Sequence, residues 1–253
     1  MLPRAPDFRL DGRRALVTGA SRGIGFAATA ALAQAGAAVT LVARNESGLR
    51  EACSELRAAG FRCDSIALDV TDSHAVNARI AAAEPFPILV NNAGMNRPKE
   101  LVDLEDEDID AVLDLNVKGA FYVTRSVTRQ LLAAGMPGSV INISSQMGCV
   151  GSPRRTLYCA SKHALEGMTK ALAWELGPAG IRVNTLCPTF IETAMTAGMF
   201  ADASFREWVT SRIALGRLGR VEEIMGAVLF LASDASSLVT GSALMLDGGW
   251  TAA

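Results

Sequence analysis

Thr18-Gly19-Ala20-Ser21-Arg22-Gly23-Ile24-Gly25 is the stretch of sequence that decides the fold. It follows an apolar run, Ala15–Thr18, and precedes a helical pattern over residues 24–35. Glycines let the backbone approach phosphate groups closely, and the N-terminus of the following helix offers free N–H groups and a positive dipole end. A glycine triplet would also suit a plain tight turn, but its position after the first predicted strand favours a pyrophosphate-binding turn.

The rest of the chain alternates between short apolar runs and longer, Ala-rich amphipathic segments. The apolar runs have the length of strands that are buried on both faces, and they lie at Ala15–Thr18, Ala38–Val42, Ser65–Leu68, Ile88–Asn91, Val140–Ile143, Val183–Leu186 and Ala243–Leu246. Helical periodicity is found at about residues 24–35, 47–59, 73–83, 106–133, 156–176 and 221–232. This alternation predicts an α/β fold, a Rossmann-type doubly wound parallel sheet of about seven strands with helices on both faces.

Domain organisation is expected to be simple. The sequence has no repeat, low-complexity tract or linker-like change in composition, so residues 1–253 are expected to form a single dinucleotide-binding and catalytic domain. One stretch, residues 189–220, breaks the rhythm because it holds four aromatic residues among Gly, Ala and Thr, namely Phe190, Phe200, Phe205 and Trp208. A long aromatic insertion after a sheet strand predicts a substrate lid.

Composition and charge argue against several functional classes. The 24 basic and 26 acidic residues leave a net charge of −2, which gives no electrostatic basis for binding nucleic acid or an anionic membrane. No apolar run reaches the roughly 18 residues that a membrane span needs, and the polar start of the chain lacks the apolar core of a signal peptide, so a cytoplasmic location is expected. Five cysteines without a CxxC pair and only two histidines predict reduced thiols and no metal site.

Two residues of one helical segment carry the strongest chemical signal. Tyr158 and Lys162 are four positions apart, so their phenol and ammonium groups share one helix face. A free tyrosine has a pKa near 10 and is a poor base at neutral pH, but a nearby cation favours the phenolate. This spacing predicts an acid/base pair.

Five motifs occur in a characteristic order along the chain: the TGASRGIG turn, Asn91-Asn92-Ala93-Gly94, Asn116, Ser145 and Tyr158-x-x-x-Lys162. Together they resemble the short-chain dehydrogenase/reductase superfamily, in its single-domain branch of approximately 250 residues that includes 3-oxoacyl reductases. The resemblance extends from about Leu10 to Gly249. It implies an oxidoreductase that transfers a hydride between a nicotinamide cofactor and a small carbonyl or secondary alcohol.

The resemblance implies a role for each catalytic residue. Tyr158 is the acid/base, and Lys162 holds the nicotinamide ribose and relays protons. Ser145, thirteen residues before the tyrosine, polarises the substrate oxygen. Asn116 is unfavourable in mid-helix, so we expect a local kink there that holds a water beside Lys162. The lysine and the oxidised nicotinamide together are expected to lower the pKa of Tyr158 by roughly two to three units.

Cofactor contacts are expected at the carboxyl ends of the predicted strands. The glycine turn and the resemblance together assign them to Gly19, Ser21, Arg22, Gly23, Ile24, Gly25, Arg44, Asp69, Val70, Asn92, Ala93, Gly94, Tyr158, Lys162, Pro188, Ile191 and Thr193. Asp69 and the N–H next to it would contact the adenine. Thr189 stands where relatives usually carry glycine, and this leaves the local turn open because threonine disfavours a positive φ.

The second predicted strand distinguishes between the two nicotinamide cofactors. It ends in Ala43-Arg44, without the acidic residue that binds the adenosine ribose in NAD-dependent proteins. Arg44 and Arg22 could bind a 2′-phosphate with bidentate hydrogen bonds, although both could also be solvated surface residues. NADP(H) is therefore the preferred cofactor, with NAD(H) possible.

The sequence indicates the substrate only in outline. The resemblance places Gln146 and Arg155 in a loop that lines the substrate pocket, and Phe190 would add an apolar wall. An arginine there suits an acidic substrate, whereas the aromatics of the lid suit an apolar one. Alternative hypotheses are an NAD-linked dehydrogenase of a hydroxy acid or sugar-type alcohol and a non-catalytic nucleotide-binding regulator. Relatives assemble as tetramers, so the resemblance also implies a homotetramer.

Overall fold

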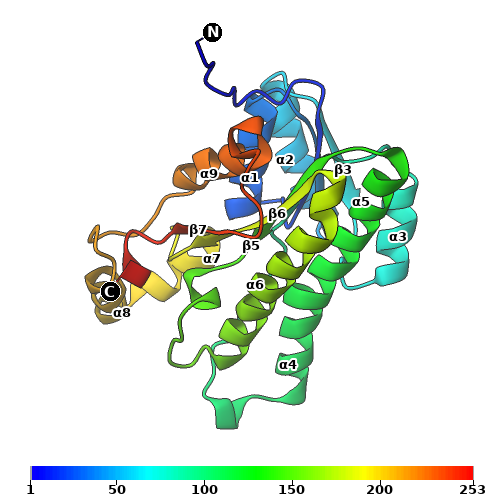
Figure 1. Cartoon of the computed structure of the whole chain (residues 1–253). Coiled ribbons are helices and arrows are strands. Elements are labelled where there is room, and N and C mark those ends of the chain that lie inside the picture. Colours follow the sequence, from blue (N-terminus) through cyan, green and yellow to red (C-terminus); the bar gives the residue numbers. More distant parts are fainter. Residues whose placement is uncertain (1, 253) are drawn as a thin grey trace.

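The computed structural model describes residues 2–252, without the side chains of residues 194 and 195, and is built on one seven-stranded sheet (Figure 1). All neighbouring strands are parallel, in the order β3-β2-β1-β4-β5-β6-β7. The strands are β1 Arg14–Thr18, β2 Ala38–Ala43, β3 Cys63–Ala67, β4 Ile88–Asn91, β5 Gly138–Ile143, β6 Ile181–Pro188 and β7 Ala243–Leu246. The predicted Rossmann-type fold is confirmed.

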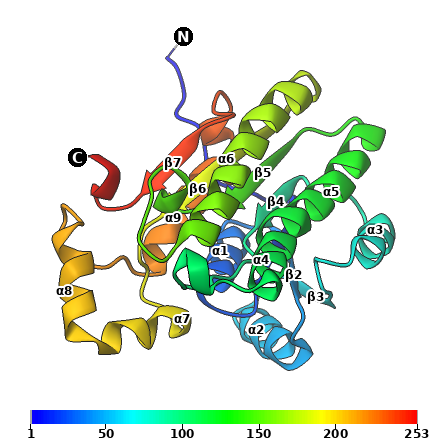
Figure 2. The ribbon, with the colours of Figure 1, turned by 90° about the horizontal axis from the view of Figure 1, so that it is seen from below.

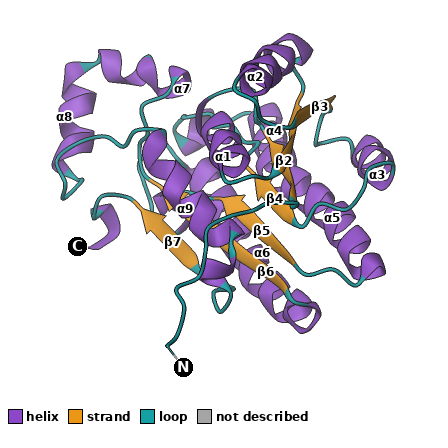
Figure 3. Cartoon of the chain, turned by 90° about the horizontal axis from the view of Figure 1, so that it is seen from above, coloured by secondary structure: helices purple, strands orange, loops and turns teal. Residues whose placement is uncertain are grey.

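Two layers of helices cover the sheet (Figures 2 and 3). The helices are α1 Gly23–Gln34, α2 Glu46–Ala58, α3 Ser73–Ala81, α4 Asp106–Leu113, α5 Ala120–Ala134, α6 Thr156–Leu176, α7 Ala194–Ala197, α8 Ala203–Ser211 and α9 Glu222–Ala232. Apolar residues of α1, α2 and α9 form one core with the sheet, while those of α3, α5 and the end of α6 form the core on the opposite face. Burial on both faces explains why the central strands are apolar throughout.

The strand order creates the position for a site. The chain leaves β1 toward β2 and β3 and later returns to β4 on the other side of β1. Ligands of open α/β sheets bind beyond the carboxyl ends of the strands, at the point where the order reverses. Here that point lies between β1 and β4, and the glycine turn that follows β1 lies directly at it.

The aromatic insertion forms a separate small cluster at one end of the molecule. Its core consists of Val209, Ile213 and Leu218, with the aromatic side chains Phe190, Phe200, Phe205, Trp208 and Trp250 packed against them. Trp250 comes from the short 3-10 helix Trp250–Ala252, which lies close to α8 in Figure 1. Its ring centroid is 5.9 Å from that of Phe190 and 5.9 Å from that of Trp208, so the last described residues pack onto the insertion.

The element boundaries differ from the predicted ones in two instructive places. Strand β3 begins two residues earlier than predicted, because Cys63 and Asp64 pair with β2 although the strand is partly exposed. The predicted helix over residues 106–133 is divided into α4 and α5 by a π-helical turn, Asp114–Gly119. Among the helices of the described residues, none is long and apolar enough to cross a membrane.

Candidate active site

The glycine turn packs tightly against the end of β4. Gly19 has a φ of 63°, and a Cβ there would lie 2.8 Å from Nδ2 of Asn92. A Cβ on Gly25 would collide with the carbonyl oxygen of Gly19. Both positions therefore require glycine. The first turn of α1 holds no acidic residue and its N-cap, Arg22, makes no side-chain capping bond, so its backbone N–H groups can serve an anionic group such as a pyrophosphate.

Asn92 supports this turn from the next strand of the sheet. Its Nδ2 donates to the carbonyl oxygens of Thr18 (3.1 Å) and Gly19 (3.0 Å). The hydroxyl of Thr18 in turn accepts hydrogen bonds from the backbone N–H groups of Asn92 and Ala93, both at 3.0 Å. The amide of Asn92 thus fixes the shape of the turn. Its effect on a bound cofactor would be indirect, through the backbone of Thr18 and Gly19.

The ends of β2 and β3 bring Arg44 and Asp69 together. Nη1 of Arg44 lies 3.8 Å from Oδ2 of Asp69, and about two thirds of the arginine side chain is exposed (66%). Oδ1 of Asp69 accepts hydrogen bonds from the backbone N–H and the hydroxyl of Thr71, at 2.9 and 2.8 Å. Arg22 is also exposed, so both guanidinium groups predicted to bind a 2′-phosphate are open to solvent.

The remaining predicted cofactor contacts lie around the turn. Ser21 is next to the start of α2, since a Cβ on Gly48 would lie 3.5 Å from its Cβ. Ile24 is partly buried in the core beneath α1. Val70 is buried against Gly119, and Gly94 lies beside Asn116, whose Oδ1 would be 3.2 Å from a Cβ on that glycine.

The residues after β6 extend over the glycine turn. Thr193 caps α7 and lies near Gly23, where an added Cβ would be 3.7 Å from the Thr193 methyl group. Ile191 is buried and pairs with Gly219 in an isolated parallel bridge. The segment that follows Pro188 therefore reaches the glycine turn through Thr193.

Thr189 does not need the backbone freedom of glycine. Within residues 2–252, Arg154 is the one non-glycine residue with a positive φ (58°), so Thr189 lies in an ordinary region of the φ/ψ map. Its backbone N–H donates to the carbonyl oxygen of Leu246 at 3.1 Å. Thr189, which stands where relatives usually carry glycine, therefore causes no backbone strain in this turn.

Tyr158, Lys162 and Ser145 converge at the carboxyl end of β5. Nζ of Lys162 is 5.5 Å from the centroid of the Tyr158 ring and donates to the carbonyl oxygen of Ile143 at 2.8 Å. Ser145 follows β5, and its hydroxyl lies close enough to the phenol of Tyr158 to lower the pKa of that phenol. The hydroxyl also donates to Oε1 of the buried Gln146 at 2.8 Å, so the predicted substrate residue Gln146 orients the serine.

Burial determines the acid/base properties of the pair. It raises the pKa of Tyr158 to about 12, against a smaller lowering by the hydrogen bond with Ser145. Burial also lowers the pKa of Lys162 to about 8, while Cys187 and Glu166 raise it. Without a cofactor, the protein therefore does not give Tyr158 the lowered pKa predicted for the complete site. Most of that lowering would have to come from the positive charge of the oxidised cofactor.

Asn116 lies in the π-helical turn Asp114–Gly119, at the point where its low helix propensity predicts a local kink. It is almost fully buried, and its Oδ1 accepts from the backbone N–H of Met95 at 2.8 Å. Its Nδ2 donates to the carbonyl oxygen of Met95 at 2.9 Å and to the hydroxyl of Ser161 at 3.0 Å. Ser161 precedes Lys162, so Asn116 connects the loop after β4 to helix α6.

The other two predicted substrate residues occupy different surroundings. Arg155 is the N-cap residue that precedes α6, and burial together with the neighbouring Arg154 lowers its pKa. Phe190 belongs to the aromatic cluster, with its ring centroid 5.9 Å from those of Phe200 and Phe205. Arg155 thus borders α6, whereas Phe190 packs against the core of the insertion.

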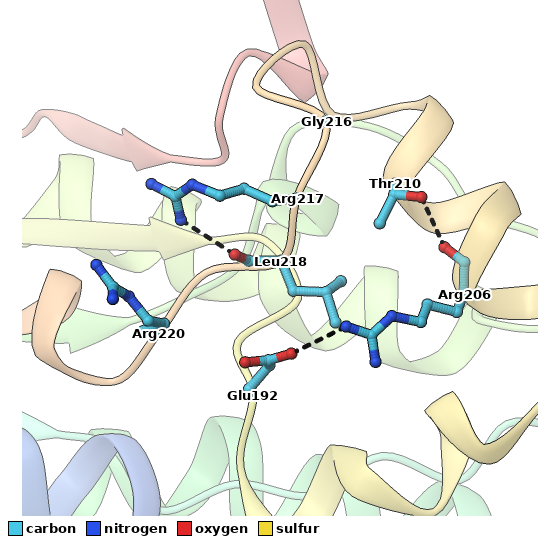
Figure 4. A pocket seen from close by; sticks show the side chains of 7 residues that line it. All are labelled: Glu192, Arg206, Thr210, Gly216, Arg217, Leu218 and Arg220. Atoms are coloured by element: carbon cyan, nitrogen blue, oxygen red, sulfur yellow. Dashed lines mark hydrogen bonds and ion pairs between the residues drawn. The ribbon is translucent and has the colours of Figure 1, made fainter. Parts of the chain in front are cut away.

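Two cavities lie beside the insertion, and neither contains Tyr158 or Ser145 in its lining. One of about 440 Å³ is lined by charged residues (Figure 4), with Arg217 and Arg220 on one side and Arg206 on the other. Glu192 pairs with Arg206 at 3.4 Å. The second, of about 520 Å³, lies between the base of the insertion and residues 245–249. Both cavities thus border the insertion and lie apart from the Tyr158 side chain.

Several residues that shape the site are missed by sequence reasoning. Thr18 belongs to the TGASRGIG motif, but its hydrogen bond with Asn92 is not predicted from it. The carbonyl of Ile143, which accepts a hydrogen bond from Lys162, is marked by no sequence pattern. Glu166 is also missed, although its spacing of eight residues from Tyr158 places it on the same helix face. Among the described residues there is no group of three or more His, Cys, Asp or Glu side chains arranged to hold a metal ion.

The fold and its switch point define the class, a Rossmann-type α/β protein, and comparison with known proteins specifies it further. A family model described as enoyl-(acyl carrier protein) reductase matches residues 19–251. The gluconate 5-dehydrogenase of Gluconobacter oxydans is 41% identical over 251 residues, with 97% of this chain and 98% of the relative covered. The 3-oxoacyl-[acyl-carrier-protein] reductase of Thermotoga maritima is 42% identical over 245 residues, with 95% and 98% covered.

A solved structure agrees over nearly the whole chain. The crystal structure of a gluconate 5-dehydrogenase from Burkholderia cenocepacia in complex with NADP and tartrate matches with a TM-score of 0.94 and 40% identity, covering 97% of this chain and 98% of that one. The chain belongs to the short-chain dehydrogenase/reductase superfamily, as its motifs predict.

Proposed function

We propose that the protein is an NADP(H)-dependent oxidoreductase that interconverts a carbonyl compound and the corresponding secondary alcohol. The observation that carries the proposal is the convergence of Ser145, Tyr158 and Lys162 at the carboxyl end of β5, on the sheet edge where the glycine turn follows β1. The free N–H groups of α1 fit a pyrophosphate, and the related Burkholderia structure holds NADP. Arg44 and Arg22, with no acid at the end of β2, favour the 2′-phosphate.

In the direction of reduction, each residue has a defined task. Tyr158 donates its proton to the carbonyl oxygen, which its raised pKa allows because the phenol is neutral at pH 7. Ser145 hydrogen-bonds the same oxygen as negative charge develops on it. Lys162 holds the ribose and returns a proton to the tyrosine, with Asn116 shaping the adjoining π turn. When bound, NADP(H) supplies or accepts the hydride, and its oxidised ring adds a positive charge to the site.

A polyhydroxylated carbonyl compound or sugar acid is the substrate class that we favour. Gluconate 5-dehydrogenases are among the relatives, and tartrate accompanies NADP in the related structure. Arg155 adds a positive charge beside the start of α6, which suits a carboxylate on the substrate.

The insertion and the surface of the two long helices suggest how the protein works as a whole. We propose that residues 1–253 act as one domain, with residues 189–220 as its substrate lid.

Helices α5 and α6 expose three large apolar side chains, those of Phe121, Leu132 and Trp174. This exposure supports self-association, in our proposal as a homotetramer. The five free cysteines agree with the proposed cytoplasmic location.

The test replaces one of the two tyrosines of the chain at a time. Tyr158→Phe removes the hydroxyl that protonates the substrate, so NADPH-linked reduction of ketoses and keto sugar acids should fall at least about 100-fold. NADPH binding, followed by fluorescence, should persist. Tyr122→Phe on α5 is the matched control and should keep wild-type turnover. Near-normal turnover of Tyr158→Phe would contradict the proposed mechanism.

A further inference from the structure

Glu166 is an acidic residue buried behind the Tyr158–Lys162 pair. It lies on α6 with 7% of its surface exposed, four residues after Lys162 and on the same helix face. Burying a carboxylate is costly unless it is hydrogen-bonded and balanced by a positive charge. Its location beside the proposed catalytic lysine therefore calls for a function.

The structure builds a small polar pocket around this carboxylate. The hydroxyl of Thr185 donates to Oε2 at 2.9 Å, and the thiol of Cys187 donates to Oε1 at 3.4 Å. Both donors come from β6 and are uncharged. On the third side stands Gly148, where a Cβ would lie 3.2 Å from Oε1 of Glu166 and 2.7 Å from Oγ of Ser144. The hydroxyl of Ser144 is buried without a hydrogen-bond partner in the described structure.

Lys162 is the basic group whose positive charge this carboxylate can stabilise. Only 5% of the lysine is exposed, and its Nζ donates to a single carbonyl, that of Ile143. Burial lowers the pKa of Lys162, while Cys187 and Glu166 raise it. Without an opposing negative charge, the lysine would lose its proton at a lower pH.

The other titratable groups around the pair do not supply that charge. They are Tyr158 and Lys170 on α6, Cys187 on β6, Cys149 after the short helix Gln146–Gly148, and Asp247 after β7. Burial raises the pKa of Tyr158 and of Cys187 to about 12 each, and it also raises the pKa of Cys149. These three groups are neutral at pH 7, so a Cys187 thiolate, which would raise the pKa of Lys162, is not formed there, and Glu166 is the remaining group that raises it. Asp247 acts on Cys149 and is bonded to the backbone of Gly249 and Thr251.

We infer that Glu166 is a positioning residue that keeps the buried Lys162 ammonium charged, so that the lysine can hold the cofactor ribose and support Tyr158. The inference rests on the proposed function for these two roles. Glu166 acts through Lys162, because its own carboxylate is held by Thr185 and Cys187 of β6. Two charges one helical turn apart in a partly dry site interact strongly enough to move the lysine titration by about one pH unit.

The experiment compares two uncharged variants, Glu166→Gln and Glu166→Met, with the charge-retaining Glu166→Asp. The dissociation constant of NADPH is measured by fluorescence from pH 6 to 10, together with kcat/KM for the best reducible substrate. In the wild type, NADPH binding should weaken as Lys162 deprotonates near pH 8. In both uncharged variants this midpoint should fall by about one pH unit, and Glu166→Asp should restore most of it. Glu175→Gln, at an exposed position of the same helix, should leave it unchanged.

Each outcome has a definite meaning. A midpoint unchanged in both uncharged variants overturns the role of Glu166, and so does a loss of binding that is equal at every pH. Melting temperatures identify a variant that fails to fold, and the other uncharged variant then decides. If the wild type reduces no carbonyl compound, the proposed activity fails, but the pH midpoint of NADPH binding still tests Glu166.

Discussion

Arg44→Ala is the substitution that most directly tests how the protein distinguishes NADPH from NADH. The arginine extends from the end of β2 into solvent, and its Nη1 lies 3.8 Å from Oδ2 of Asp69. No acidic side chain occupies the end of β2, where NAD-dependent proteins bind the adenosine ribose. The substitution removes the guanidinium and leaves the glycine turn intact.

The exposure of Arg44 sets the size of the expected effect. A hydrogen bond to a charged group contributes about 1.5–3 kcal/mol, and water screens a side chain that is 66% exposed, so the lower end applies. A loss of about 1.5 kcal/mol weakens NADPH binding roughly 10-fold. NADH lacks the 2′-phosphate, and its affinity should change less than about 2-fold because the pair with Asp69 is long and exposed.

Fluorescence titration with both cofactors at one ionic strength measures the effect, since added salt weakens exposed charge pairs. Arg50→Ala, an exposed arginine on α2, is the matched control and should leave both affinities unchanged. Equal weakening of NADPH and NADH would show that Arg44 acts on the adenosine common to both. Wild-type protein that binds NADH as tightly as NADPH would refute the phosphate argument altogether.

Two further predictions concern residues that hold the site together. Asn116→Ala removes three buried hydrogen bonds, to Met95 and Ser161, and should lower stability by about 2–3 kcal/mol and the melting temperature by about 5–10 °C; an unchanged melting curve would refute its role in holding the π turn. Arg97 and Lys99 hold the pKa of Asp108 well below its usual range. Their stabilisation is therefore present above about pH 4 and lost as the pH falls further. The melting temperature of the wild type should exceed that of Asp108→Asn at pH 7, and a gap that persists undiminished at pH 3 would contradict this reading.

Local sequence patterns were sufficient to predict the framework. Strands β4 and β7 and helix α6 have the predicted bounds, because each is a short apolar run or a long amphipathic segment with clear ends. Asn116 marked the interruption between α4 and α5, since asparagine is a poor helix former.

The contacts that shape the site could not be predicted in the same way. Asn92 supports Thr18 and Gly19 across more than 70 residues of sequence, and nothing near either position indicates the partner. In the sequence alone, Glu166 has the features of an ordinary exposed helix residue. Its burial becomes evident only from its packing against Thr185 of β6. Its environment is decided by tertiary packing, which a single sequence without a structure does not reveal.

The aromatic cluster has a consequence for spectroscopy. Two of the three tryptophans, Trp208 and Trp250, lie within one cluster with ring centroids 5.9 Å apart and planes at 75°, while Trp174 stands 87% exposed on α6. A soluble quencher such as iodide reaches Trp174 first, so the emission that survives quenching comes from the pair. The fluorescence of Trp208 and Trp250 therefore reports, without any added label, on the contact between the insertion and the 3-10 helix Trp250–Ala252.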